Sequence, residues 1–444
     1  MKQEENELLT RVGAGTPMGE LFRQYWLPAL TREDLPDAGG DPMRIRLLGE
    51  NLIAFRDSQG KVGLVSEFCP HRTASLFFAR NEQEPGLRCV YHGWKFDRHG
   101  NCLETPNERP ESTLKSRIRI AAYPCAERNN IIWTYMGPLA SPPPLPDIEW
   151  SLVPPEQAHI TKRIQECNWA QALEGALDSS HGSFLHALND GDVYSGSMHA
   201  RGYNYLLKDR HPWFEVEDTD CGVMMAARRD AEEDSYYWRI TQFLMPCHAV
   251  IPPYGPNPVF NAQTLVPMDD ENSICWAITY HPQRALTEKD RWSPSRAYEM
   301  LGGGLHVRPE RMLPKSPEAG GAWRVAANKT NNYLFDAKAQ RTTRFSGLPG
   351  VAMQDAAIQE SMGGIANRSL EHLGLADAGI VRFRRRCTQA ALGLSERGTV
   401  PPEALKSASY RVRSASVVLN RGVNWIDGAR DWLVIQPGRL LDAA

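Results

Sequence analysis

Four side chains that bind metals well occur in two short motifs in the first quarter of the chain. Cys69 and His71 belong to the motif C-P-H, and Cys89 and His92 belong to the motif C-V-Y-H, with seventeen residues between the two motifs. Each motif offers one thiolate and one imidazole, which are donors for zinc and for iron–sulfur clusters. Because one metal site needs both motifs, this segment has to fold into two neighbouring loops.

Two kinds of site use two Cys and two His. A structural zinc ion usually takes them from the pattern C-x2–4-C followed by H-x3–5-H. A Rieske [2Fe–2S] centre holds one iron with two Cys and the other with two His. Here each motif contributes one Cys and one His, which favours the Rieske cluster over zinc. We therefore expect Cys69, His71, Cys89 and His92 to bind a [2Fe–2S] cluster.

Composition narrows the class of protein. The chain has 444 residues, long for one domain and sufficient for two, and its net charge of −3 gives no basic surface for nucleic acid. No apolar run approaches the roughly 18 residues of a membrane span. The polar, acidic start MKQEENE is unlike a signal peptide. We expect a cytoplasmic protein whose nine Cys residues are cluster ligands or reduced thiols.

The N-terminal part reads as a small β domain. Thr16 is a helix cap followed by Pro at the first helical position, so a short helix is predicted over residues about 15–30. Short β runs separated by turn residues then extend from about 43 to 136. A proline-rich segment at 137–146 is a semi-rigid linker. We predict an all-β domain, with the N-terminal helical segment, over residues 1–148.

The remainder, residues 149–444, reads as a larger domain of another kind. It opens with a helical segment, and β runs follow at 235–243 and 273–280. A helix is predicted at about 352–373. Strands followed by a late helix indicate an α+β domain in which the helix packs on an antiparallel sheet.

The opening helical segment carries a second group of metal-binding side chains. Glu174, Asp178 and His181 are spaced as neighbours on one helix face, whereas His186 follows His181 by five residues, some 140° off that face. We therefore expect the helix to break near Gly182 through a bulge of one residue. Two His and one carboxylate form the site of non-haem iron oxygenases, which leaves open positions for O2.

The carboxylate ligand has to come from another part of the chain. Asp355, near the start of the late helix, is the preferred ligand, and Glu360 and Asp336 are alternatives. Asp178 has two interpretations. It orients His181 through a hydrogen bond, as acids near metal-binding His residues do, or it bridges the iron site to a cluster His.

Two segments resemble a known family. Residues 69–94 and the run N-W-A-Q-A-L-E-G-A-L-D-S-S-H at 168–181 are similar to the α-subunit of Rieske non-haem iron aromatic-ring-hydroxylating oxygenases. Residues 6–13 and 354–368 resemble its phthalate 4,5-dioxygenase branch, so the likeness covers nearly the whole chain. It implies a helix-grip (START-like) catalytic domain with the iron beneath a curved antiparallel sheet.

The resemblance also implies partners. Subunits would form a head-to-tail homotrimer, alone or stacked as a hexamer, and electrons would pass from the cluster of one subunit to the iron of the next. Asp178 would then connect a cluster His to His181 of the neighbouring chain. Electrons would come from NADH through a separate FMN and [2Fe–2S] reductase. The chain has no G-x-G-x-x-G motif between a strand and a helix, which agrees with an external reductase.

An aromatic carboxylate as substrate would need a cationic partner, for which Arg is the best side chain. Arg239, in the aromatic run Y-Y-W-R, is the preferred candidate, and Arg201 and Arg210 are alternatives expected on β segments. Ser179, beside the predicted iron ligands, is a further candidate for contact with the carboxylate.

Three functions fit these residues. The first is a dioxygenase that cis-dihydroxylates phthalate or a relative such as isophthalate, chlorobenzoate or phenoxybenzoate, in aromatic catabolism. The second is a Rieske monooxygenase or O-demethylase, which uses the same two metal sites. The third is an electron carrier without catalysis, which would leave His181, His186 and the larger domain without a role.

Overall fold

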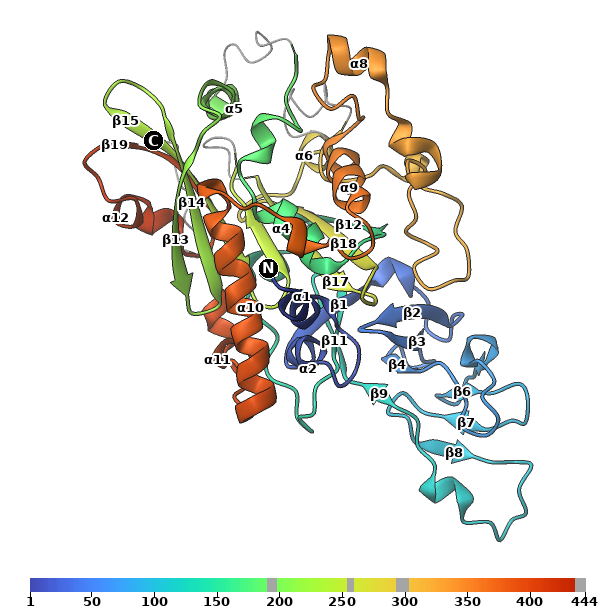
Figure 1. Cartoon of the computed structure of the whole chain (residues 1–444). Coiled ribbons are helices and arrows are strands. Elements are labelled where there is room, and N and C mark those ends of the chain that lie inside the picture. Colours follow the sequence, from blue (N-terminus) through green and yellow to red (C-terminus); the bar gives the residue numbers. More distant parts are fainter. Residues whose placement is uncertain (190–197, 254–258, 293–302, 436–444) are drawn as a thin grey trace.

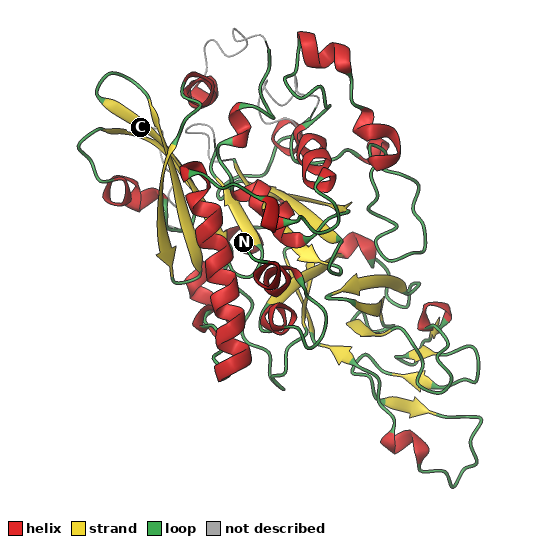
Figure 2. Ribbon diagram, viewed as in Figure 1, coloured by secondary structure: helices red, strands yellow, loops and turns green. Residues whose placement is uncertain are grey.

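The computed structural model describes residues 1–189, 198–253, 259–292 and 303–435. A small β-rich part formed by the N-terminal third projects from a larger part, in which helices cover an antiparallel sheet (Figure 1, Figure 2). Over the residues described, no helix is both long and apolar enough to cross a bilayer.

The N-terminal part consists of short antiparallel strands. They are β1 (Trp26–Thr31), β2 (Met43–Leu47), β3 (Glu50–Arg56), β4 (Val62–Ser66), β5 (Arg80–Asn81), β6 (Leu87–Arg88), β7 (Lys95–Phe96), β8 (Cys102–Glu104), β9 (Ala122–Tyr123), β10 (Cys125–Arg128) and β11 (Ile131–Tyr135). Three sheets result, with the orders β1-β11-β10, β2-β3-β4-β9 and β5-β6-β7-β8. The predicted all-β character of this region is confirmed.

The larger part contains one extended antiparallel sheet. Its strands are β12 (Ala158–Gln165), β13 (Trp213–Thr219), β14 (Gly222–Asp230), β15 (Ser235–Leu244), β16 (His248–Ile251), β17 (Phe260–Pro267), β18 (Ser273–Tyr280) and β19 (Ala415–Asn420). The order is β12-β18-β17-β16-β15-β14-β13, and β19 pairs with the first half of β15. Every residue of β17 and β18 is buried, because both faces of the sheet are covered there. The α+β class is confirmed.

The helices cover this sheet and the N-terminal strands. They are α1 (Gln3–Thr10), α2 (Pro17–Arg23), α3 (Glu149–Leu152), α4 (Trp169–Leu177), α5 (Met198–Lys208), α6 (Glu288–Trp292), α8 (Ala337–Thr342), α9 (Val351–Ser361), α10 (Ala378–Arg397), α11 (Pro402–Leu405) and α12 (Trp425–Ala429). The long α10 runs beside β13 and β14 and contacts α1 and α2, whereas α4 crosses β16 and β17 (Figure 1).

Two predicted helices are shorter than expected. Thr16 caps α2 by accepting a 3.1 Å hydrogen bond from the backbone N–H of Gly19, but α2 ends at Arg23, and the following residues form β1, which pairs with β11. The late helix α9 stops before Gly363, whose φ of +92° lies outside the helical region. Strand pairing and a glycine therefore end these helices earlier than predicted.

A close contact between α4 and α9 sets the position of the functional site. Gln171 on α4 donates hydrogen bonds of 3.0 and 2.9 Å to the carbonyl oxygens of Gln359 and Gly363. Gly175 faces the same helix, and a Cβ there would lie 1.9 Å from Gln359 Nε2, so a larger residue would force the Gln359 side chain to move. The helix α4 is thereby held beside the last turn of α9.

Candidate metal centres

The chain leaves the α-helix before the first predicted iron ligand. Asp178 has an extended backbone (φ −70°, ψ 125°), and His181–Ser183 form a separate 3₁₀ turn. The carboxylate of Asp178 accepts hydrogen bonds from the backbone N–H groups of Ser180 (2.7 Å) and His181 (3.0 Å) and so caps this new turn. The predicted common helix face and the bulge near Gly182 are therefore wrong, because the break lies at Asp178.

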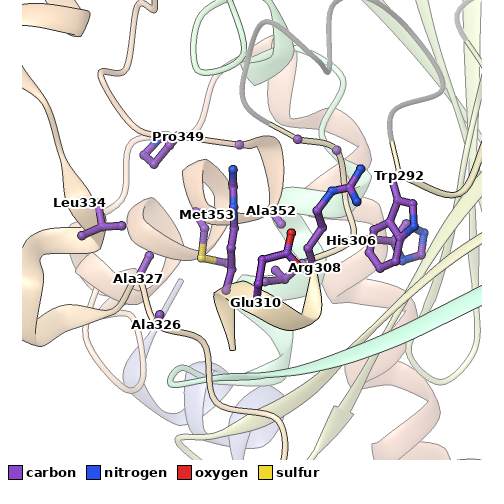
Figure 3. Close-up of a pocket in the computed structure, with 15 residues that line it drawn as sticks. Trp292, His306, Arg308, Glu310, Ala326, Ala327, Leu334, Pro349, Ala352 and Met353 are labelled. Atoms are coloured by element: carbon purple, nitrogen blue, oxygen red, sulfur yellow. The ribbon is translucent and has the colours of Figure 1, made fainter. Parts of the chain in front are cut away.

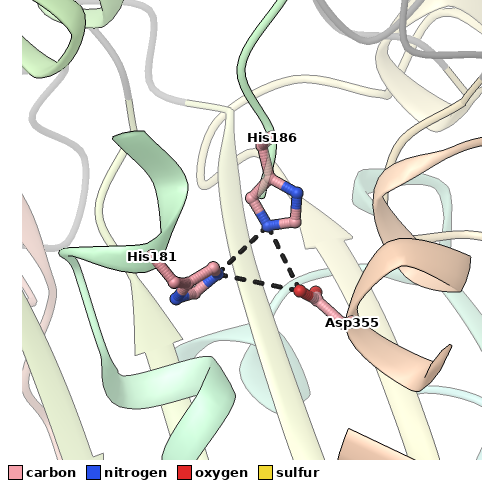
Figure 4. A group of neighbouring side chains, drawn as sticks. All are labelled: His181, His186 and Asp355. Carbon is pink, nitrogen blue, oxygen red and sulfur yellow. Dashed lines mark hydrogen bonds and ion pairs between the residues drawn. The ribbon is translucent and has the colours of Figure 1, made fainter. Parts of the chain in front are cut away.

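Three donor atoms from different elements converge beyond this turn (Figure 4). His181 Nε2 lies 3.1 Å from His186 Nε2, and Asp355 Oδ1 lies 3.2 Å from His186 Nε2 and 3.7 Å from His181 Nε2. Asp355 Oδ1 is buried and accepts no hydrogen bond. Ligand atoms about 3 Å apart are what one face of an octahedral ion requires, so these residues fit a divalent iron with open positions opposite them.

The alternative carboxylates have other partners. Glu360 accepts a 2.5 Å hydrogen bond from the Tyr333 hydroxyl. Asp336 caps α8 through the N–H groups of its first turn. Glu174 forms an ion pair with Arg384 on α10, at 2.8 Å, and thus holds α4 rather than the metal centre. Among the sequence candidates, only Asp355 reaches both His residues.

Neighbouring side chains fix the orientation of the two imidazoles. His181 Nδ1 lies 3.2 Å from Asp178 Oδ2, and His186 Nδ1 lies 2.7 Å from Gln354 Oε1. In both rings a proton on Nδ1 leaves the lone pair of Nε2 directed at the centre. Tyr203, from α5, donates a 2.5 Å hydrogen bond to the carbonyl oxygen of His186. The sequence analysis did not predict a role for Gln354, although Gln354 directly precedes Asp355. Nothing in the sequence pointed to Tyr203.

Electrostatics favour an anionic Asp178 and an anionic Asp355. Burial raises the pKa of each carboxyl. Hydrogen bonds from His181 and Ser180 outweigh burial at Asp178, and charge interactions with His186 and His181 outweigh it at Asp355, so both pKa values are lowered. Arg163, a buried residue of β12, adds to the lowering of the pKa of Asp355. Burial alone would lower the pKa of His181, yet its bond to Asp178 raises it.

An arginine that sequence reasoning missed holds the turn between Asp178 and His181. Arg229, on β14, is 1% exposed and donates a 2.8 Å hydrogen bond to the carbonyl oxygen of Ser179. It also contacts the Ser179 hydroxyl at 3.4 Å and the carbonyl oxygen of Asp209 at 3.2 Å. The hydroxyl of Ser179 accepts the hydrogen bond from Arg229, and its role in substrate binding stays a prediction.

The three candidate substrate arginines lie in different environments. Arg239 is on β15, 5% exposed, and two positions from Tyr237 on the same face of the strand. Arg201 falls in α5, not on a β segment, and its side chain lies outside the described part of the chain. Arg210 follows α5, is exposed, and bonds to the carbonyl oxygen of Leu207. The expectation that Arg201 and Arg210 lie on strands is wrong.

The two N-terminal motifs form matching loops after β4 and β6. The N–H of Thr73 donates a 2.9 Å hydrogen bond to the carbonyl oxygen of Cys69. The N–H of Gly93 likewise donates a 2.9 Å hydrogen bond to the carbonyl oxygen of Cys89. Thr73 and Gly93 both have a left-handed backbone, with φ of +57° and +77°. A Cβ on Gly93 would lie 2.7 Å from Pro106 Cγ, which explains the glycine.

The side chains of these loops fit a cluster with two Cys and two His. Cys69 and Cys89 are buried. Burial and, to a smaller extent, the neighbouring Cys89 raise the pKa of Cys69 to about 11. Bound iron would remove that proton, because a coordinated thiol ionises. The rings of His71 and His92 are 4.4 Å apart, and His71 stacks on Trp94 at 4.5 Å. His71 Nδ1 is buried without a hydrogen-bond partner, as expected of an atom that faces a metal.

Two domain models and several known proteins match this chain. The Rieske [2Fe-2S] domain model matches residues 25–124, and a model described as LigXa C-terminal domain like matches residues 134–433. The 3-chlorobenzoate-3,4-dioxygenase oxygenase subunit of Comamonas testosteroni is 37% identical over 433 residues, which cover 95% of this chain and 96% of the relative. The chain belongs to the Rieske non-haem iron oxygenases.

A second relative and a solved structure are also similar to this chain, the latter in fold alone. The phthalate 4,5-dioxygenase oxygenase subunit of Pseudomonas putida is 34% identical over 96% of this chain and 94% of the relative. A crystal structure of dicamba monooxygenase bound to dicamba has a TM-score of 0.56 at 17% identity, over 85% of this chain and 99% of that chain. The predicted family is confirmed, and with it a [2Fe–2S] cluster and a mononuclear iron as cofactors. Oxygenase components of this kind work with O2 and a reductase or ferredoxin partner.

Proposed function

We propose that this oxygenase is the terminal component of a system that cis-dihydroxylates an aromatic carboxylate, such as phthalate or a related benzoate. Electrons would come from NADH through a separate flavin and iron–sulfur reductase. The observation that carries the proposal is the convergence of His181, His186 and Asp355 in a chain that also has a Rieske domain. When bound, the cluster supplies single electrons and the mononuclear iron activates O2.

The residues around the two centres have distinct tasks in this proposal. Cys69, His71, Cys89 and His92 hold the cluster, and His181, His186 and Asp355 hold the mononuclear iron. Asp178 and Gln354 keep the two imidazoles in the protonation state and orientation that ligation needs. The protein thus supplies positioning, while the metals supply the redox chemistry.

Electron transfer is proposed to occur between subunits of a head-to-tail trimer, alone or stacked as a hexamer. Within one chain, the strands β6 and β7, which flank one cluster loop, project away from α9, which carries Asp355, and from α4, which precedes the turn with His181 (Figure 1). The side chains of Asp178 and His181 keep 24% and 27% exposure, so a neighbouring cluster domain can reach them. Asp178 is then the residue that connects the two centres.

The substrate class rests on two relatives and one buried arginine. The relatives at 37% and 34% identity are named for 3-chlorobenzoate and phthalate, both aromatic carboxylates. Arg239 lies on the same face of the sheet as Arg229, because Arg239 pairs with Ala227 and Arg229 pairs with Tyr237 on adjacent strands. Arg229 reaches the turn beside the iron ligands, so this face of the sheet looks toward the metal centre. We assign the carboxylate to Arg239, with Arg201 as the alternative.

The experiment that tests the function uses purified oxygenase, a phthalate-type reductase, NADH and ¹⁸O2. Phthalate, isophthalate, chlorobenzoates and phenoxybenzoate are incubated separately, and products are identified by mass spectrometry. We expect a cis-diol that carries two labelled oxygen atoms from one of these acids.

Other outcomes assign a different reaction. One labelled oxygen atom in the product, or loss of an alkyl group, would make the protein a monooxygenase or O-demethylase. A reducible cluster and a filled iron site without product from any acid would refute the aromatic carboxylate as substrate. An iron content that the cluster alone accounts for would indicate an electron carrier.

A further inference from the structure

A cavity lies next to the iron ligands, but none of the iron ligands lines it. Its volume is about 640 Å³, within the range of sites that bind small organic molecules (Figure 3). We call it the α9 pocket, since it surrounds the first turn of α9. Its lining includes Trp292, His306, Arg308, Ala326, Ala352 and Met353.

The α9 pocket and the metal centre share one helix. Ala352 and Met353 line the pocket, and the next two residues, Gln354 and Asp355, face His186. The N–H groups of Val351 and Ala352 bond to the carbonyl oxygens of residues 303 and 304 at 3.0 and 3.1 Å, which attaches the opposite wall of the pocket to the helix. A molecule in the pocket would therefore contact α9 on a different face from the one that carries Asp355.

The lining combines apolar surface with positive charge. Ala326, Ala352 and Met353 offer apolar contacts, and the described lining also includes Arg308, Arg311 and a single acid, Glu310. The guanidinium of Arg308 lies 4.9 Å from the centre of the Trp292 ring. Among the described residues no carboxylate pairs with Arg308, so its charge is available to an anion.

His306, which lies beside Trp292 in the lining (Figure 3), adds no charge to the pocket. His306 Nδ1 and Nε2 lie 2.8 and 2.9 Å from the hydroxyl oxygens of Thr161 and Thr279, so both ring nitrogens already have partners. Burial lowers the pKa of His306 well below its ordinary value, which keeps the ring neutral. Positive charge in the lining thus comes from its arginines, while the apolar side chains suit an aromatic ring.

We propose that the α9 pocket binds an aromatic carboxylate, with the ring against Ala326, Met353 and Trp292 and the carboxylate at Arg308. The inference rests on the proposed function, and it adds an entry site for the same class of acid, separate from the position where the acid reacts. An anion held there is concentrated beside the helix that carries Asp355. The charge of Arg308 would thus affect the entry of an acid, whereas Arg239 would hold the carboxylate during the reaction at the iron.

The test measures binding and turnover in the full-length, iron-loaded oxygenase. Phthalate and 3-chlorobenzoate are titrated without reductase, and binding is followed by quenching of tryptophan fluorescence, with Trp292→Phe to identify the signal from the pocket. We expect Arg308→Gln to raise the Kd about tenfold, as for the loss of one charged hydrogen bond, and to lower kcat/KM while kcat stays unchanged. Glu310→Gln should lower the Kd.

The control is Arg324→Gln, an exposed arginine on the same stretch of chain that pairs with Glu318 and does not line the pocket. Benzamide, without a negative charge, should bind the wild type and Arg308→Gln equally. If Arg308→Gln and Glu310→Gln both turn over acids normally, with unchanged Kd and kcat/KM, the α9 pocket is not an entry site. The proposed function would then still stand. Quenching that depends on Trp292 and Arg308, without turnover of any acid, would support the pocket and refute the proposed function.

Discussion

Gln354 and His186 are joined by a hydrogen bond of 2.7 Å between Gln354 Oε1 and His186 Nδ1. The amide can adopt only this orientation, because Gln354 Nε2 donates to the carbonyl oxygen of Leu348 at 3.0 Å. The His186 proton therefore resides on Nδ1, and Nε2 is free to bind a metal. Since Asp355 is the next residue on α9, one turn of helix supplies one ligand and orients another.

Gln354→Leu should weaken metal binding without unfolding the helix. The leucine has a similar size but leaves His186 Nδ1 without an acceptor, and losses of this kind cost about 10- to 100-fold in metal affinity. The affinity is measured with Fe(II) or Co(II) in competition with a chelator. Gln354→Glu is the matched control, because it keeps an acceptor oxygen and should retain most of the affinity. Wild-type affinity in Gln354→Leu would show that the hydrogen bond does not orient the ligand.

Asp355→Ala should empty the mononuclear site and leave the cluster unchanged. It removes the only described carboxylate that lies within 4 Å of both His181 and His186. Iron analysis should show the loss of one iron per chain, while the visible absorption of the Rieske cluster stays the same. Asp336→Ala, which removes the cap of α8, should keep full iron content. Retention of iron and turnover in Asp355→Ala would disprove the assignment.

The sequence predicted the ligands better than the backbone that carries them. Residue types and spacing selected Cys69 and His71, which stay predicted ligands, and aromatic and β-branched runs located β11, β15 and β18. Helical periodicity continues through Asp178 and His181, so it could not reveal that the helix ends at Asp178. That end depends on local capping by the Asp178 carboxylate and on Arg229, some fifty residues away, which only the tertiary structure brings to the turn.

Arg229→Met should slow electron transfer to the mononuclear iron while iron content is kept. Without the bond to the Ser179 carbonyl oxygen, the turn that carries Asp178 and His181 loses its support, and small displacements of reacting groups cost tenfold or more in rate. We expect about a tenfold slower single turnover of the reduced enzyme.

Two further variants distinguish this positioning role from a general loss of stability. Arg229→Lys retains a donor and should recover part of the rate. Arg228→Met is the matched control, since Arg228 is the preceding residue of β14 and stacks on Tyr236 instead, at 4.4 Å. If Arg228→Met and Arg229→Met slow single turnover equally, Arg229 has no specific role in positioning the turn.

Acid should destabilise the larger domain through His159. This residue packs between Trp292 (4.6 Å between ring centres) and His306 (4.4 Å), and burial lowers its pKa to about 4. An unfolded His has a pKa of about 6.5, so between these values the unfolded chain binds more protons, and stability falls as the pH decreases. From pH 7 to pH 5, His159 accounts for up to about 2 kcal/mol of the loss.

His159→Phe should remove that part of the pH dependence, because phenylalanine keeps the ring contacts and cannot be protonated. Urea unfolding midpoints, followed by tryptophan fluorescence at pH 7 and pH 5, are compared for the wild type, His159→Phe and His99→Phe, the last of which alters an exposed turn. The midpoint of His159→Phe should decrease less on acidification than the other two. An equal decrease in all three proteins would mean that His159 is not a source of acid sensitivity.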